Sequence, residues 1–361
     1  MTIEDLGEKL FLHNLLPKLV TQPDFLNGFG HDSSILDIGL QDVAIAMKID
    51  RAGKPVAAIN GWTDYRMWGR LAVTANCSDI LAVGGEPKGF MLSISVPRNW
   101  EASAVEDVVF GAEEECLRNG VCFLGGDTKE SNESQVVGAA LGVVKKDYYI
   151  GRKAAKRGDY LVLAGNLGGF VGSYLQAKAG VDRIDACLEY MAYPRARWVE
   201  AALVNQQRLA LGGMDLSDGL FDALKSLVAP GNGIVIDIDS LPYHSIAIES
   251  SRLYSVPIFN MAFGVGDWAM LYAVAPSNID RIRKLVKEGG VQMTVIGRVV
   301  ERAGVYGYRS TDGMHEIDGI VNENFKSRME DQGSFFDSIK NKVSLHPITD
   351  RSILSQIEAG L

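Results

Sequence analysis

The segment Val121 to Thr128 reads Val-Cys-Phe-Leu-Gly-Gly-Asp-Thr and constrains the fold more than any other stretch. Its four apolar residues predict a short buried strand, and Gly125 and Gly126 allow the backbone to turn where a side chain would clash. Asp127 and Thr128 follow at once. An acid fixed at the end of a rigid strand suits a metal ligand, although taken alone the segment is explained more simply by an Asx-turn.

Length and charge narrow the class of protein. A chain of 361 residues predicts two domains, and 47% hydrophobic residues suffice for two cores. The net charge of -9 argues against a nucleic-acid partner. We expect no membrane segment, because no apolar run reaches spanning length. The first 20 residues are amphipathic, unlike a signal peptide, and the widely spaced Cys77, Cys116, Cys122 and Cys187 fit a cytoplasmic protein without a zinc site.

Strand and helix patterns alternate through the first half of the chain. Helices are predicted at 6–19, 62–83 and 102–119, and strands at 42–50, 89–97, 121–124 and 135–144. A basic segment at 151–159 marks the join to a second domain with strands at 160–164, 234–238, 270–274 and 294–299. This predicts an α+β fold with domains at 1–148 and 149–325, and a loosely attached helical tail at 326–361.

Aspartates recur beside glycine or small polar residues, mostly where a strand ends or a helix begins: Asp32, Asp50, Asp79, Asp127, Asp215 and Asp218. Each alone is explained by a turn or a helix cap. Carboxylates that converge on one cleft would repel one another without cations between them, and ligands that are all oxygen favour Mg²⁺, which also bridges phosphates. The set therefore predicts a site for a nucleoside triphosphate and Mg²⁺, with Arg152 and Lys153 meeting the remaining phosphate charge.

Six motifs, in order, resemble the aminoimidazole ribonucleotide (AIR) synthase superfamily, and their pattern is most similar to that of the thiamine-monophosphate kinases. They are Gly30–Leu36, the strand ending at Asp50, Leu71–Pro87 with its polar Asn76-Cys77-Ser78-Asp79, Gly125–Thr128, Arg152–Asp159 and Asp215–Leu220. The resemblance implies a PurM-like α+β chain of two domains. In such a chain the N-terminal domain, a mixed β-sheet with helices, forms a homodimer that binds ATP across its interface, and the C-terminal domain is α/β.

The resemblance also implies roles for individual residues. Asp32, Asp50, Asp79, Asp127 and Asp218 would bind Mg²⁺ directly or through one water. The nucleotide would contact Asp50, Asn76, Gly125, Gly126, Asp127, Thr128 and Arg152. Arg152 would also touch the transferred phosphoryl group, while Ser217 and Asp218 would face the acceptor, so that Asp127, Ser217, Asp218 and Arg152 form the expected catalytic set.

The chain departs from the kinase pattern on the acceptor side. His31 replaces the first of two successive acids, and the loop Gly264–Leu271 lacks both glutamates of the family motif Gly-Glu-Asp-Tyr-Glu-Leu. Three functions stay open. They are phosphotransfer to a small molecule, a dehydrating synthase reaction in which ATP activates an amide or carbonyl oxygen, and a non-catalytic nucleotide-binding or maturation partner.

Overall fold

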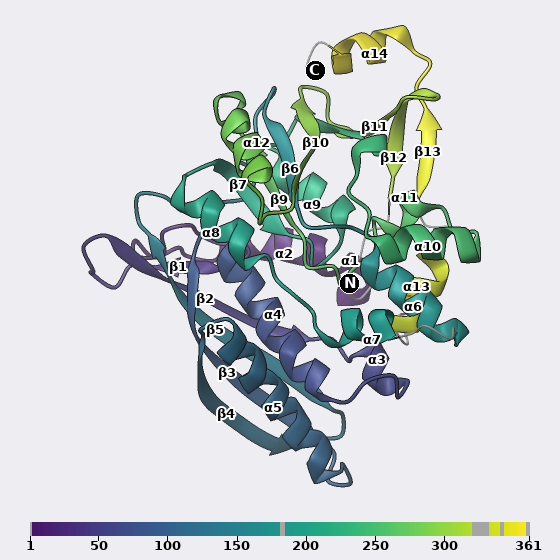
Figure 1. Cartoon of the computed structure of the whole chain (residues 1–361). Helices are drawn as coiled ribbons and strands as arrows, with labels where there is room; N and C mark the ends of the chain where they lie inside the picture. The colour runs from purple at the N-terminus through teal and green to yellow at the C-terminus, as the bar shows by residue number, and fades with distance from the viewer. Residues whose placement is uncertain (1, 181–184, 320–331, 340–342, 359–361) are drawn as a thin grey trace.

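The computed structural model describes residues 2–180, 185–319, 332–339 and 343–358, which form two α+β units with one sheet each (Figure 1). The N-terminal sheet has the order β1-β2-β5-β3-β4, in which only β3 and β4 are parallel. Its strands are β1 (Ser34–Leu36), β2 (Val43–Ala52), β3 (Glu86–Val96), β4 (Cys122–Glu130) and β5 (Gln135–Lys145). The predicted α+β class is confirmed.

Helices α4 (Arg66–Ala82) and α5 (Ala102–Arg118) cover one face of this sheet, and the short α3 (Val56–Ile59) precedes them. Strand β2 alternates between buried Ala44 and Ala46 on the helix side and exposed Met47 and Ile49 on the other. Because side chains alternate across a strand, Lys48 must point the same way as Ala46, toward α4.

The C-terminal unit contains an eight-stranded sheet in the order β13-β12-β11-β8-β10-β6-β9-β7. Its strands are β6 (Tyr160–Ala164), β7 (Ala210–Asp215), β8 (Gly233–Asp237), β9 (Met270–Val274), β10 (Met293–Val300), β11 (Gly304–Arg309), β12 (Gly313–Asp318) and β13 (Ser344–Pro347). Its helices are α6 (Gly169–Ala179), α7 (Asp185–Ala192), α8 (Trp198–Gln206), α9 (Leu220–Leu227), α10 (Ser245–Tyr254), α11 (Ile258–Met261), α12 (Ile279–Glu288), α13 (Gln332–Ser338) and α14 (Arg351–Glu358). Strands β6 and β9 are almost wholly buried, as their continuous apolar sequences predict.

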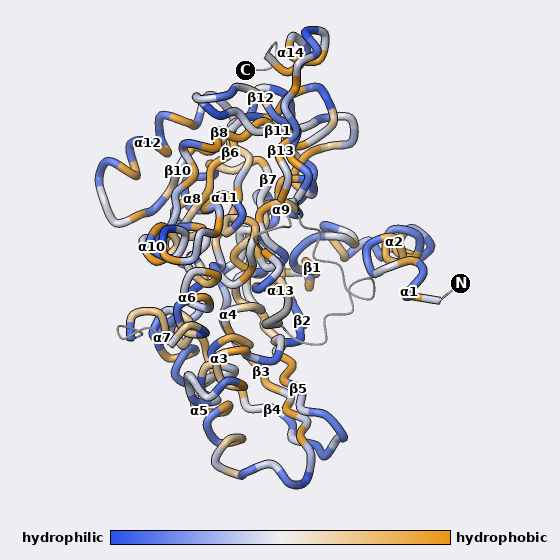
Figure 2. The backbone as a smooth tube through the Cα atoms, turned by 90° about the vertical axis from the view of Figure 1, so that its right-hand side faces the viewer, coloured by the Kyte–Doolittle hydropathy of each residue, from blue (hydrophilic) through white to orange (hydrophobic). Residues whose placement is uncertain are grey.

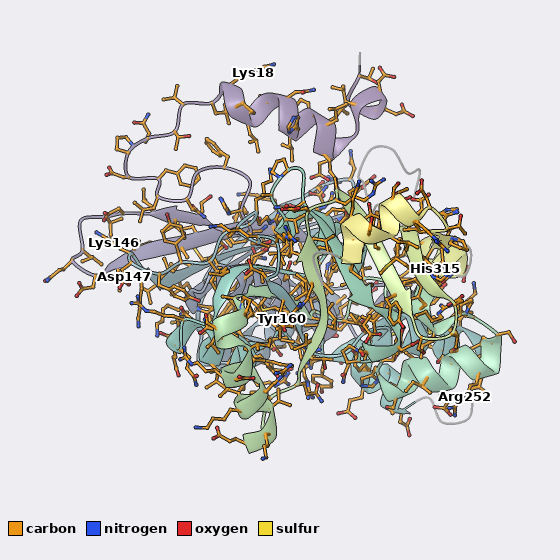
Figure 3. All side chains as sticks on the ribbon, turned by 90° about the horizontal axis from the view of Figure 1, so that it is seen from above. Lys18, Lys146, Asp147, Tyr160, Arg252 and His315 are labelled. Carbon is orange, nitrogen blue, oxygen red and sulfur yellow. The ribbon has the colours of Figure 1, made fainter. Side chains whose placement is uncertain are left out.

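The N-terminal helix differs from its prediction. Gly7 adopts φ 73° and divides it into α1 (Ile3–Leu6) and α2 (Glu8–Leu15), followed by a 3-10 turn at Leu16–Lys18. Figures 2 and 3 show this segment set apart from the two units. Within α1 and α2, which are fully described, no residue is buried, and Leu10 is 45% exposed. The leucine face predicted to pack is therefore only partly covered in the protomer: Leu6, Leu15 and Leu16 are half-buried, whereas Leu10 and Leu19 are exposed.

The C-terminal tail is also more firmly attached than predicted. Strand β13 pairs with β12 and extends the second sheet, and Phe335, Phe336 and Ile339 belong to the main hydrophobic core. Burial of three large apolar side chains outweighs the polar composition of the neighbouring sequence. The start of the predicted tail, 326–331, lies outside the described residues. Within the described ranges, no helix is long and apolar enough to cross a membrane.

Candidate metal and nucleotide site

Three buried carboxylates meet at the junction of the two units. Asp32 precedes β1, Asp79 lies on α4, and Asp215 ends β7, and one oxygen of each lies within 4.8 Å of the others. All three residues are at most 4% exposed. The structure thus brings together Asp32 and Asp79 from the predicted metal set and adds Asp215, which the sequence singled out among the recurring acids.

The electrostatics of this group are unfavourable without a cation. Burial, and then the charge of Asp215, raise the pKa of Asp79 well above its usual range, although Lys48 opposes the shift. Burial, and then the charge of Asp32, raise the pKa of Asp215. Among the described atoms, Asp215 Oδ2 and Ser33 Oγ are buried without a hydrogen-bond partner. Carboxylate and hydroxyl oxygens without partners are the ligand set that Mg²⁺ prefers, so the residues fit the predicted ion.

Lys48 is a candidate site residue that the sequence analysis did not identify. Its Nζ lies 3.0 Å from Asp79 and 3.8 Å from Asp50, and its side chain is 23% exposed. Burial would lower the pKa of Lys48, but the charges of Asp79 and Asp50 outweigh burial and raise it. The alternating pattern of β2 could have predicted this contact, because it places Lys48 and Asp50 on the face of the strand that packs against α4.

Arg152 supplies a second cation to the same group. Its Nε donates to Asp32 Oδ2 at 3.2 Å, a second guanidinium nitrogen pairs with Oδ1, and its backbone N–H donates to His31 Nδ1 at 3.1 Å. Burial would lower the pKa of Arg152, yet the neighbouring Asp32 raises it. The residue that replaces the family's first acid, His31, therefore holds the backbone of Arg152.

The Gly125–Thr128 segment lies elsewhere in the protomer. Asp50 on β2 aligns through β5 and β3 with Gly126 on β4, so three strand spacings, about 14 Å, separate Asp127 from Asp50. Asp127 is exposed and lies 3.6 Å from Lys129. Gly125 has φ +87°, and a Cβ at Gly126 would lie 1.6 Å from the Leu92 carbonyl oxygen. The two glycines are required by the backbone here, and their nucleotide contacts stay a prediction.

The remaining predicted residues have definite structural partners. Asn76 is fully buried, and its Nδ2 donates to the Ala72 carbonyl at 2.9 Å. Ser217 Oγ donates to Asp215 Oδ1 at 2.9 Å, so it orients that carboxylate. Among the described contacts, no side chain caps the N-terminus of α9, which begins after Gly219. Ser217 and Asp215 therefore do not cap this helix. Asp218 is exposed, yet partial burial raises the pKa of its carboxyl to about 6.

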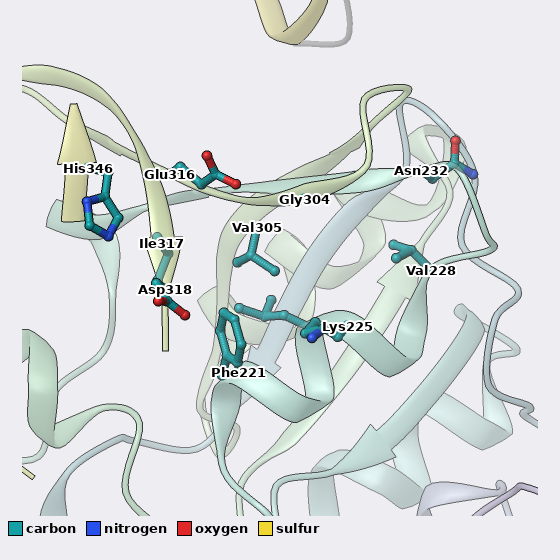
Figure 4. A pocket seen from close by; sticks show the side chains of 11 residues that line it. Phe221, Lys225, Val228, Asn232, Gly304, Val305, Glu316, Ile317, Asp318 and His346 are labelled. Carbon is teal, nitrogen blue, oxygen red and sulfur yellow. The ribbon is translucent and has the colours of Figure 1, made fainter. Parts of the chain in front are cut away.

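Two further cavities lie near these elements. One, of about 450 Å³, is formed by α9 and strands β11 to β13 (Figure 4). Lys225 and the acids Glu316 and Asp318 all line this cavity, so the lining favours neither an anionic nor a cationic ligand. The other, of about 630 Å³, lies on the outer face of the N-terminal sheet and includes Asp32 and Lys48 beside Met47, Ile49, Met91 and Leu124.

Fold and site together define a two-unit α+β protein with a buried, oxygen-rich acidic site where the units meet. Family models described as AIR synthase related protein, N-terminal domain and C-terminal domain, match residues 30–144 and 156–309. The chain belongs to this family, as its motifs predicted.

Individual relatives differ in activity. A thiamine-monophosphate kinase of Pyrococcus horikoshii is 30% identical over 66% of this chain and 73% of its own length. A phosphoribosylformylglycinamidine cyclo-ligase of Streptococcus pyogenes is 26% identical over 77% of this chain and 86% of its own. The solved structure of AaThiL complexed with AMPPCP and TMP has a TM-score of 0.73 at 23% identity, covering 85% of this chain and 95% of that one, which shows a shared fold.

Proposed function

We propose that this protein is an ATP- and Mg²⁺-dependent enzyme that transfers a phosphoryl group to a small-molecule acceptor of the thiamine phosphate class. The observation that carries the proposal is the buried group of Asp32, Asp79 and Asp215 beside Arg152. Membership of a family with kinase relatives supports it. Phosphoryl transfer requires mainly positioning and charge neutralisation, which these residues are built to provide.

Asp32, Asp79 and Asp215 would hold the magnesium ion, whose charge neutralises phosphate oxygens. Asp50, Asp127 and Asp218 are proposed as further ligands, directly or through water. Arg152 and Lys48 would bind phosphate oxygens, because both cations border the carboxylate group. On the acceptor side, Ser217 orients Asp215 through its hydrogen bond, and Asp218 would face the acceptor.

We further propose that two copies pair through the outer face of the N-terminal sheet, with ATP bound across the interface. Ile49 is 71%, Met47 50% and Leu124 48% exposed on that face. A contiguous apolar face of this kind marks an association surface. Pairing would also allow the Gly125–Thr128 segment of one copy to approach the carboxylate group of the other.

The proposed dimer predicts that a single charge introduced on the outer face of the sheet prevents the two copies from pairing. Wild-type protein should have twice the 39.2 kDa chain mass in light scattering, and Ile49→Lys should be a monomer, because a buried ammonium without a partner is costly. Leu117→Lys is the matched control, since Leu117 is 73% exposed on α5, on the opposite side of the sheet. A dimeric Ile49→Lys variant would exclude this interface.

Product analysis tests the reaction itself. Incubation with ATP, Mg²⁺ and thiamine monophosphate should yield ADP and a doubly phosphorylated acceptor, and Asp127→Asn should reduce this turnover. Formation of ADP and free phosphate with a dehydrated amide or carbonyl substrate would instead support the synthase, which the longer match to the cyclo-ligase favours as second candidate. Binding of an ATP analogue without turnover of any acceptor would point to a non-catalytic role.

A further inference from the structure

A lysine of the N-terminal helix reaches an acid in the first turn of α9. Lys9 lies on α2, and its Nζ is 2.5 Å from Asp222 Oδ1. The Lys9 side chain is 41% exposed, whereas Asp222 is only 7% exposed. The ion pair therefore joins a helix on the surface to a buried acid of the C-terminal unit.

The environment of Asp222 makes this pair more than a surface contact. Among the described atoms, Asp222 Oδ2 is buried and has no hydrogen-bond partner. The start of α9 favours an acid in its first turn, but that effect needs no lysine. An ion pair between two exposed residues contributes little, whereas a buried carboxylate that loses its cation is left with an uncompensated charge. Lys9 supplies that cation from outside the C-terminal unit.

The same lysine acts on Asp218, which lies just before α9. Burial raises the pKa of the Asp218 carboxyl, the charge of Lys9 opposes this rise, and the charge of Asp222 adds to it. Lys9 is thus within electrostatic reach of both carboxylates. A phosphate-bearing acceptor that approached Asp218 would be repelled by these two acids, and the positive charge of Lys9 offsets part of that repulsion.

Helix α2 is otherwise loosely connected to the proposed site. No residue of α1 or α2 is buried, and residues 17–24, which lead from α2 into the N-terminal unit, are all exposed. Beyond them the chain is fixed again, because the Leu26 N–H donates to the Ile35 carbonyl at 2.9 Å. Asp32 lies between these two anchored residues. Loss of the Lys9 ion pair can therefore release α2 without moving Asp32.

We propose that Lys9 is a positioning residue for the acceptor side: its ion pair with Asp222 tethers α2 to α9 and places a positive charge beside Asp218, where a phosphate-bearing acceptor would approach. The acceptor role rests on the proposed phosphotransfer, whereas the tether exists without any ligand. Because Lys9 is outside the proposed metal and nucleotide set, its loss should affect the acceptor and leave ATP binding intact.

Steady-state kinetics of the full chain with ATP, Mg²⁺ and thiamine monophosphate test the acceptor role. Lys9→Met should raise the KM for thiamine monophosphate about fivefold, while kcat and the KM for ATP change by less than about twofold. Lys9→Arg keeps the charge and should restore the wild-type KM. Lys18→Met is the matched control, because Lys18 follows α2 on the same segment and has no ion pair among the described residues.

Hydrogen exchange of residues 3–15 measures the tether without any turnover. Lys9→Met should speed their exchange about fivefold relative to the wild type, and Lys9→Arg and Lys18→Met should leave it unchanged. Asp222→Asn should speed the exchange to the same extent. The double variant of Lys9→Met and Asp222→Asn should exchange no faster than either single variant, because both changes remove the same ion pair.

The two measurements separate this inference from the phosphotransfer itself. Unchanged exchange in Lys9→Met, or faster exchange with an unchanged KM for thiamine monophosphate, would overturn the proposal while the wild-type reaction stands. A wild type that does not phosphorylate thiamine monophosphate would overturn the proposed phosphotransfer and the acceptor role of Lys9 with it, and the exchange rates would still decide whether Lys9 tethers α2.

Discussion

Replacement of Asp215 by asparagine is expected to weaken Mg²⁺-dependent nucleotide binding roughly 100-fold while making the metal-free protein more stable. The raised pKa of Asp215 means that its ionised form is disfavoured in the folded state, so at pH 7 the carboxylate reduces the free energy of unfolding. Asparagine removes this charge and keeps the Oδ1 that accepts from Ser217. The metal-free thermal midpoint should rise by about 2 °C.

Thermal unfolding with and without AMPPCP and Mg²⁺ measures both effects. Asp159→Asn is the matched control, because Asp159 is 6% exposed and accepts from the Lys156 N–H at 2.8 Å, away from the carboxylate group. This control should keep the ligand-induced rise. A lower metal-free midpoint for Asp215→Asn, or an undiminished rise with ligand, would contradict the metal-site assignment.

Replacement of Lys48 by methionine should have the opposite effects: it should lower the stability of the metal-free protein and strengthen Mg²⁺ binding. The raised pKa of Lys48 means that the folded state favours its ammonium, and this stabilisation is fully present at pH 7. Without it, the buried Asp79 loses its nearest cation and must either stay charged without compensation or take up a proton, which should lower the free energy of unfolding by about 3 kcal/mol in the absence of metal. The site also becomes more negative, so Mg²⁺ should bind about tenfold more tightly.

Denaturant titration over a range of Mg²⁺ concentrations separates these two effects. Magnesium should restore much of the lost stability of Lys48→Met and stabilise it more than the wild type, by mass action. Lys48→Arg is the control that keeps the charge, and its metal response should resemble the wild type. Equal Mg²⁺ stabilisation of Lys48→Met and wild type would show that Lys48 does not neutralise the metal site.

Much of the fold was readable from the sequence because local patterns and the final structure agree. The helix predicted at 102–119 is α5, and the strand predicted at 160–164 is β6. The Asp312-Gly313 pair, which is typical of a hairpin turn, lies where β11 and β12 join. Boundaries shifted where tertiary contacts override local signals, as at β3, which begins at Glu86 because that residue pairs with Val143 on β5.

The sequence by itself determined the family and the two-unit α+β architecture, and it identified the recurring acids, because these follow from residue order and local periodicity. Their placement at strand and helix ends was not fully correct, since Asp127 lies within β4 and Asp79 within α4. Only the tertiary structure decided which acids meet. Asp32, Asp79 and Asp215 come from segments far apart in the chain, whereas Asp127, on edge strand β4 of the N-terminal sheet, stays about 14 Å from Asp50. Their encounter, and the position of Lys48 between Asp79 and Asp50, depend on how α4 packs between the two sheets, and no local pattern records that packing.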